Sequence, residues 1–216
     1  MSATHHPDDA TLLSYAAGTL DEAFVLLVAS HLAGCAECHA RVRLAENVGG
    51  SLLEQAETVA LSAGALDRAF ARIELAPERL PIAAPVASAE LPVPLASKLG
   101  AGLDSIAWRV VAPGVRMHSV PLSAGTRGAL HLLRIDAGKH VPEHGHGGME
   151  LTLVLRGSYS DAFGRFRPGD VADLDPDAEH CPVVDPDGEC ICAVATEAPT
   201  RFRGVFSRLL QPLVGI

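Results

Sequence analysis

Three side chains that commonly bind metals lie within eight residues near the N-terminus. His31, Cys35 and Cys38 form the pattern H-x3-C-x2-C. His31 falls on the apolar stripe of an expected helix and should point inward, and Gly34 lets the chain turn before the cysteines. A Cys-x2-Cys loop closes around one tetrahedral ion, and His31 lies near the same point. This pattern predicts a zinc site.

A structural zinc ion needs a fourth ligand, and the N-terminus offers two histidines. His5 or His6 would supply it if this segment folds back over the junction between two helices. His6 is the better placed, because it directly precedes Pro7 and the start of the first expected helix. Two other interpretations remain: a buried histidine beside ordinary apolar cysteines, or a redox Cys-x2-Cys pair. The strand-to-helix context that is usual for a redox pair is missing here.

A second group of metal-binding residues occurs in the C-terminal half. His144, His146 and Glu150 form H-x-H-x3-E within the longer string G-x5-H-x-H-x3-E-x6-G from Gly138 to Gly157. Side chains two residues apart share one face of a strand, so the imidazoles should converge on one point with the carboxylate. His180, from a neighbouring strand, is the candidate fourth ligand. This set suits zinc, iron, manganese or nickel.

The secondary structure that must position these residues is expected to change from helices to strands along the chain. The first 75 residues have helical periodicity in four segments, which predicts a small helical bundle. Five prolines between residues 76 and 94 are typical of a linker. Short β-branched runs then predict strands at 107–112, 128–135, 150–155 and 190–195.

We therefore predict two domains, an all-α zinc-binding bundle and an all-β jelly-roll barrel. The expected boundaries are 1–80 for the bundle, 81–97 for a Pro/Ala-rich linker, 98–200 for the barrel and 201–216 for a tail with helical spacing.

Composition narrows the function classes. Hydrophobic residues make up 48% of the chain, enough for a real core, and no stretch is long and apolar enough to span a bilayer. No signal peptide is visible, so we expect a cytoplasmic protein whose five cysteines stay reduced. Residues 1–85 carry 11 acidic and 5 basic side chains. Such an acidic surface disfavours direct binding of nucleic acid and can attract a basic protein surface.

The first motif resembles the zinc-binding anti-sigma domain, whose pattern is H-x3-C-x2-C with an additional upstream histidine. His31, Cys35 and Cys38 match the pattern, and His6 matches the upstream ligand. The resemblance covers about residues 1–80. It implies a helical domain that binds an alternative sigma factor of the extracytoplasmic-function group and keeps it from RNA polymerase.

The string from Gly138 to Gly157 resembles the first cupin motif. The turn Pro168-Gly169-Asp170 matches part of the second motif, although His180 comes later than the family spacing places it. A zinc anti-sigma domain followed by one cupin domain resembles the ChrR-type anti-sigma factors. In that family the N-terminal domain binds the sigma factor, and the cupin part is needed for the response to singlet oxygen or related oxidants.

Two alternatives assign the barrel differently. In the first alternative, the barrel is a metal-dependent dioxygenase or isomerase. Because no substrate-clamping arginine is evident near the metal motif, we expect that the protein is not an enzyme. In the second alternative, the barrel is a passive module for dimerisation or ligand binding. Cys181, Cys190 and Cys192 follow His180 closely and are either oxidisable reporters or buried strand residues. The oligomeric state does not follow from the sequence.

Overall fold

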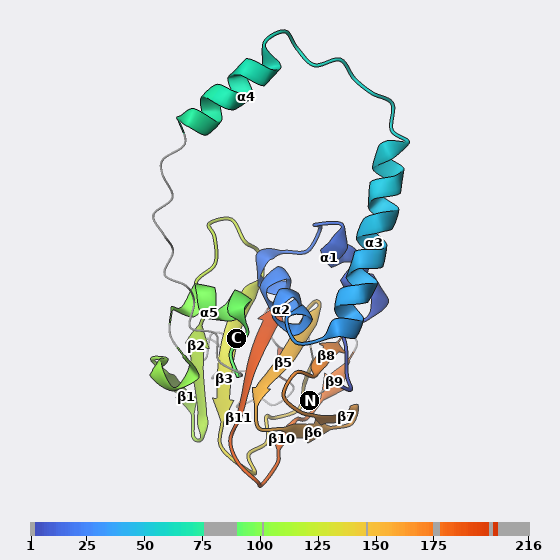
Figure 1. The fold of residues 1–216 in the computed structure, drawn as a ribbon. Coiled ribbons are helices and arrows are strands. Elements are labelled where there is room, and N and C mark those ends of the chain that lie inside the picture. The colour runs from blue at the N-terminus through green and yellow to red at the C-terminus, as the bar shows by residue number, and fades with distance from the viewer. Residues whose placement is uncertain are drawn as a thin grey trace.

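The computed structural model describes residues 3–75, 90–100, 102–145, 147–174 and 178–198, and the backbone of 201–202. The chain begins with helices and continues as strands (Figure 1). The helices are α1 (Asp9–Ala16), α2 (Glu22–Leu32), α3 (Ala36–Glu54), α4 (Ala65–Glu74) and α5 (Val93–Leu99), followed by a 3-10 turn at Leu103–Ser105. The strands are β1 (Arg109–Ala112), β2 (Val115–Ser119), β3 (Ala129–Ile135), β4 (His144–Gly145), β5 (Glu150–Arg156), β6 (Tyr159–Asp161), β7 (Gly164–Phe166), β8 (Val171–Leu174), β9 (Glu179–His180), β10 (Val183–Val184), β11 (Cys190–Thr196) and β12 (Arg201–Phe202).

Side chains just outside the helices fix where they begin. Asp8 accepts a hydrogen bond from the backbone N–H of Thr11, and Asp21 caps α2 in the same way. Cys35 is the N-cap residue of α3, and its sulfur faces the backbone N–H of Cys38 at 3.5 Å. The same residue therefore begins a helix and belongs to the predicted zinc motif.

Three antiparallel sheets form the β-rich part of the chain. The largest has the strand order β1-β2-β3-β11-β5-β8. The smaller ones have the orders β10-β6-β7 and β12-β4-β9. The expected strands at 107–112, 128–135, 150–155 and 190–195 correspond to β1, β3, β5 and β11. The fold is the expected one, a helical region followed by a β-rich domain.

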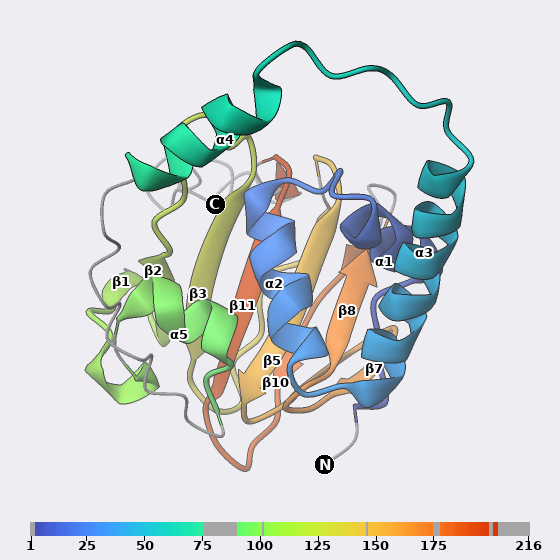
Figure 2. The ribbon, with the colours of Figure 1, turned by 45° about the horizontal axis from the view of Figure 1, so that its top comes forward.

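Helix α2 lies across the large sheet (Figure 2) and packs against β3, β5 and β11. Its apolar residues Phe24, Leu27 and Val28 belong to the same buried cluster as Leu153 and Ala193 of the sheet. Helices α1, α2 and α3 also contact one another. The core is therefore shared between the helical region and the barrel.

Polar contacts attach the N-terminal end of α2 to α5 and to the loop before β3. Glu22 accepts hydrogen bonds from the Ser123 amide at 2.7 Å and from Lys98 at 2.5 Å. Asp21 accepts from the Arg127 and Gly128 amides. A Cβ at Gly128 would lie 3.0 Å from a backbone oxygen of β11 and 3.4 Å from Phe24. Glycine at this position lets the helix approach the sheet closely.

Helix α4 departs from the expected four-helix bundle. All its residues except Ala65 are exposed, and the helix projects away from the sheet in Figure 1. Ten residues separate it from α3, so the connection is longer than a bundle of packed neighbours needs. Its apolar stripe, Leu66, Phe70 and Ile73, faces solvent. Three of the four expected helices thus pack together.

The expected helical spacing in 201–216 falls almost entirely outside the described residues. Arg201 and Phe202, which are described, form strand β12 and pair with Gly145 and His144 of β4. Strand pairing to β4 replaces helical structure at the start of this segment. Within the described ranges, no helix has the length and apolar character that crossing a membrane requires.

Candidate metal centres

The N-terminal cluster brings together the four residues that the sequence singles out. His31 comes from the last turn of α2, Cys35 and Cys38 from the start of α3, and His6 from the segment before α1. One ligand atom of each side chain lies within 4.8 Å of the others. His31, Cys35 and Cys38 are buried, and His6 is partly so. His5 instead points to the barrel, where its ring lies 4.4 Å from that of Phe166.

The distances in this cluster fit a tetrahedral ion. The Nδ1 atom of His6 lies 3.5 Å from Cys35 Sγ and 3.3 Å from Cys38 Sγ. Zinc bonds of about 2.3 Å to sulfur and 2.0–2.1 Å to nitrogen place neighbouring ligand atoms about 3.5 Å apart in a tetrahedron. Donor type and spacing therefore both suit zinc.

The protonation of His31 also suits a metal ligand. Its Nδ1 atom lies 2.9 Å from the carbonyl oxygen of Gly169, which can only accept, so Nδ1 carries the hydrogen. Its Nε2 atom is buried and has no hydrogen-bond partner among the described residues. Burial lowers the pKa of this imidazole and favours the neutral form that binds metals. A buried lone pair without a partner is costly unless a cation meets it.

The two thiols differ from ordinary exposed cysteines. Burial, followed by the neighbouring Cys35, raises the pKa of Cys38 to about 11. A bound cation would reverse that effect, because metal ions bind the thiolate. All five cysteines of the chain are free.

The second cluster lies at one end of the barrel. His144 from β4, Glu150 from the start of β5 and His180 from β9 place a ligand atom each within 4.8 Å of one another, and all three are buried. Pairing of β4 with β9 sets His144 directly opposite His180. His146, the remaining predicted ligand, lies outside the described residues. That this cluster binds a metal remains a prediction.

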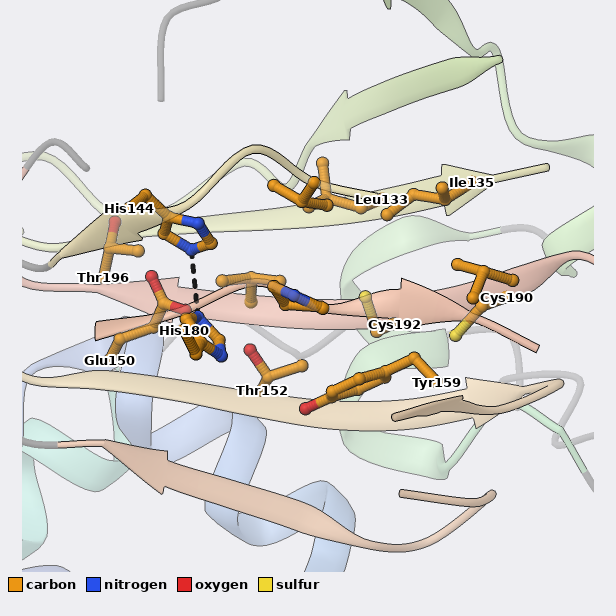
Figure 3. A pocket seen from close by; sticks show the side chains of 14 residues that line it. Leu133, Ile135, His144, Glu150, Thr152, Tyr159, His180, Cys190, Cys192 and Thr196 are labelled. Atoms are coloured by element: carbon orange, nitrogen blue, oxygen red, sulfur yellow. Dashed lines mark hydrogen bonds between the residues drawn. The ribbon is translucent and has the colours of Figure 1, made fainter. Parts of the chain in front are cut away.

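Hydrogen bonds fix both imidazoles of this cluster with Nε2 directed inward. His144 Nδ1 donates to the carbonyl of Pro142 at 2.9 Å, and His180 Nδ1 donates to the carboxylate of Asp161 at 2.9 Å. The two Nε2 atoms then face each other at 3.0 Å (Figure 3). Two lone pairs at this distance repel unless a proton or a metal ion lies between them. Adjacent ligands of an octahedral ion with bonds of about 2.1 Å are about 3.0 Å apart.

A cavity of about 80 Å³ adjoins this cluster. Figure 3 shows His144, His180 and Glu150 at one end, with Tyr159, Cys190 and Cys192 further along it. The hydroxyl of Tyr159 is buried and has no hydrogen-bond partner within the described part of the chain. The remaining lining is mostly apolar: Leu133, Ile135, Val141, Pro182, Val184 and Val194. A small, largely apolar molecule fits this space.

The cysteines of the barrel occupy two environments. The thiol of Cys181 is exposed, whereas Cys190 and Cys192 are buried on the cavity side of β11. Hydrogen bonding with Cys190 and burial raise the pKa of Cys192 well above its usual value. Because the thiolate is the reactive form, the Cys192 thiol reacts more slowly than an exposed cysteine.

Asp161 belongs to the second cluster's surroundings, and sequence patterns do not reveal it. Its side chain is completely buried and orients His180. Such carboxylate partners fix the tautomer of metal-binding histidines. No motif marks Asp161, because it comes from β6 and meets His180 only through the fold.

A helical region with a His2Cys2 cluster, followed by a β-rich domain with a His2Glu cluster, is the arrangement of a cupin protein with an N-terminal helical module and two possible metal sites. Residues 97–199 match the family model described as ChrR Cupin-like domain. The anti-sigma-E factor ChrR of Cereibacter sphaeroides is 44% identical over 216 residues, covering the whole of both chains. The chain belongs to the ChrR family of anti-sigma factors.

A solved structure supports the same assignment. The crystal structure of Rhodobacter sphaeroides SigE in complex with the anti-sigma ChrR contains a chain that superposes with a TM-score of 0.78 at 42% identity. The match covers 91% of this chain and 99% of that one. The name of the relative describes a regulator and no enzyme, in agreement with the expectation from sequence.

Proposed function

We propose that this chain is a cytoplasmic anti-sigma factor that binds an alternative sigma factor of the extracytoplasmic-function group and keeps it from RNA polymerase. The observation that carries the proposal is the full-length relationship to a protein named as an anti-sigma-E factor. The solved complex of a related ChrR with SigE supports the same partner class.

The partner would be held by the exposed apolar faces of α3 and α4. Leu44, Val48 and Leu52 follow one another at four-residue spacing on α3, and each is more than half exposed. Leu66, Phe70 and Ile73 form a similar stripe on α4. Amphipathic helices bind apolar grooves of partners through residues at this spacing. Burying one such side chain contributes about 1.5–3 kcal/mol, so a few of them suffice for tight binding.

Charge supports a protein partner. Residues 1–85 have a net charge of −6. This charge repels nucleic acid and attracts a basic surface, such as one that would otherwise contact DNA. The acidic helical region would thus compete for surfaces that a sigma factor uses in transcription.

The N-terminal cluster would shape this binding surface. His6, His31, Cys35 and Cys38 lie where the N-terminal segment, α2 and α3 meet. When zinc is bound there, it ties the start of α3 to α2, because structural zinc contributes folding free energy directly. We propose these four residues as the zinc ligands.

The cupin domain would sense oxidative stress, from singlet oxygen or related oxidants. We propose His144, His146, Glu150 and His180 as ligands of zinc or another divalent transition metal. The apolar cavity next to these ligands fits a small, uncharged oxidant, which supports a role of the barrel in detecting such molecules. A difference of about 3 kcal/mol in sigma affinity between the two states of the barrel would change release more than 100-fold.

Titration of the full chain with its sigma partner tests the binding surface. Phe70→Asp should weaken binding at least about 30-fold, since it removes an apolar contact worth about 2 kcal/mol or more. Val110→Asp is the matched control, because Val110 is also an apolar residue that is more than half exposed, and it lies on β1, away from the proposed binding surface. Cys38→Ala should also abolish binding by removing a zinc ligand. Undiminished binding by both Phe70→Asp and Cys38→Ala would refute the proposal.

The sensing role has its own test. Glu150→Gln should bind the sigma factor like the unmodified chain and should fail to release it when singlet oxygen is generated in solution. Release at the normal rate by this variant would assign sensing to another part of the molecule and leave the barrel as a passive module.

A further inference from the structure

We propose that a turn of the cupin domain, Pro168–Asp170, positions two of the four ligands of the N-terminal cluster and so sets how tightly that cluster holds its ion. The inference rests on metal binding at the N-terminal cluster, as proposed above, and not on the sigma factor. The turn lies between β7 and β8, more than 130 residues after His31.

The first contact of the turn is with His31. The carbonyl oxygen of Gly169 accepts a hydrogen bond from His31 Nδ1 at 2.9 Å. This bond fixes both the tautomer and the ring orientation, and it directs the free Nε2 atom into the cluster. A ligand from the helical region is therefore oriented by a backbone group of the barrel.

The second contact of the turn is with the segment that carries His6. Asp170, which is almost completely buried, accepts hydrogen bonds from the backbone N–H groups of Thr4 at 2.6 Å and His5 at 3.1 Å. In return, the carbonyl of His5 accepts from the backbone N–H of Val171 at 3.1 Å. The chain is thus held to the start of β8 immediately before His6.

A further bond holds the chain just after this ligand. The backbone N–H of Asp8 donates to Asp173 of β8 at 3.0 Å. His6 is therefore fixed on both sides by the barrel. Without these bonds, metal binding would itself have to order this segment, and the lost backbone entropy would weaken the binding of the ion.

Backbone hydrogen bonds hold the turn itself to β5. Gly169 has φ +94°, which favours glycine, and its N–H donates to the carbonyl of Val154 at 2.9 Å. The N–H of Val154 donates to the Asp170 carbonyl at 3.1 Å. Val154 lies on β5, the strand that begins with Glu150 of the second cluster. One strand thus supports both candidate metal centres.

Cobalt release from the full chain tests this inference. Cobalt bound to thiolates gives a charge-transfer absorption, which reports the N-terminal cluster because the ligands proposed in the barrel are imidazoles and a carboxylate. We expect Asp170→Asn to lose this absorption to excess chelator about 10- to 100-fold faster, the range typical for partners of metal ligands. Thr4→Pro removes both the backbone N–H and the hydroxyl that Thr4 donates to Asp170, leaves the barrel sequence unchanged, and should also accelerate release.

Asp185→Asn is the matched control, since the carboxylate of Asp185 accepts its side-chain hydrogen bonds from Ser158, Ser160 and Arg165, all within the barrel. It should release cobalt at the unmodified rate. If Asp170→Asn fails to fold by circular dichroism, Thr4→Pro decides alone. Release at the normal rate by the folded variants overturns the inference. A missing thiolate absorption in the unmodified chain would instead overturn metal binding at the cluster.

Discussion

Replacing Leu27 by alanine should destabilise the barrel as much as the helices. Leu27 lies on α2, is completely buried, and belongs to one apolar cluster with residues of the sheet. A buried leucine truncated to alanine costs about 2–5 kcal/mol. For a chain of this length, a loss of about 3 kcal/mol lowers the melting temperature by roughly 6–12 °C.

Two probes of thermal unfolding separate the outcomes. Far-UV circular dichroism reports largely on the helices, and the fluorescence of Trp108, the single tryptophan, reports on the β-rich part. Both midpoints should fall equally in Leu27→Ala because the core is shared. Leu52→Ala is the control: this leucine is 64% exposed, so the change should stay within about 0.5 kcal/mol. An unchanged tryptophan midpoint in Leu27→Ala would show that the two regions unfold separately and refute the reasoning.

Two further predictions concern the docking of α2 and the turn after β5. Hydrogen bonds from Lys98 and the Ser123 amide lower the pKa of Glu22 from 4.5 to about 2. The ionised Glu22 side chain therefore stabilises the folded chain fully above about pH 4.5, and this stabilisation is lost as the pH falls towards 2. The melting temperatures of the unmodified chain and Glu22→Gln, measured over this range, should therefore converge in acid; a constant difference would contradict this. A Cβ at Gly157, where φ is +71°, would lie 2.0 Å from the carbonyl oxygen of Glu189, so Gly157→Ala should cost at least about 2 kcal/mol in a denaturant titration. Gly49→Ala is the control, because Gly49 lies in helix α3 with open space around it, and this change should stabilise the chain by up to about 1 kcal/mol. Equal effects of Gly157→Ala and Gly49→Ala would argue against the close approach of Gly157 to Glu189.

Spacing along the chain predicts those parts of the sites that lie within one local element. His31, Cys35 and Cys38 span a single helix junction, so their convergence follows from the turn between two helices. The short strands could likewise be located from β-branched runs and turn residues. The metal motif and the strands both depend on local backbone geometry, which the periodicity of the sequence reports.

Contacts between distant segments could not be read in this way. The apolar stripe of α2 predicted a buried face, but a stripe does not say whether helices or a sheet will cover it. Asp161 and Asp170 are single carboxylates in turns and strands, and their partners come from elsewhere in the chain. The stripe on α4 has the same spacing as a core helix, yet it is exposed. Burial depends on what the rest of the fold, or a partner, provides.

Because of the position of α2, the N-terminal cluster lies between the barrel and helix α3, part of the proposed sigma-binding surface. The barrel holds this helix at its start through Glu22 and at its end through His31. Helix α3 continues from the cluster for 19 residues, about 28 Å. A tilt of about 10° at its base therefore moves its far end by roughly 5 Å, comparable to one helical turn. Because packed apolar surfaces lose about a quarter to a half of their contact energy with gaps of 0.5–1 Å, a small tilt at the cluster would be enough to weaken the sigma-factor binding proposed along α3.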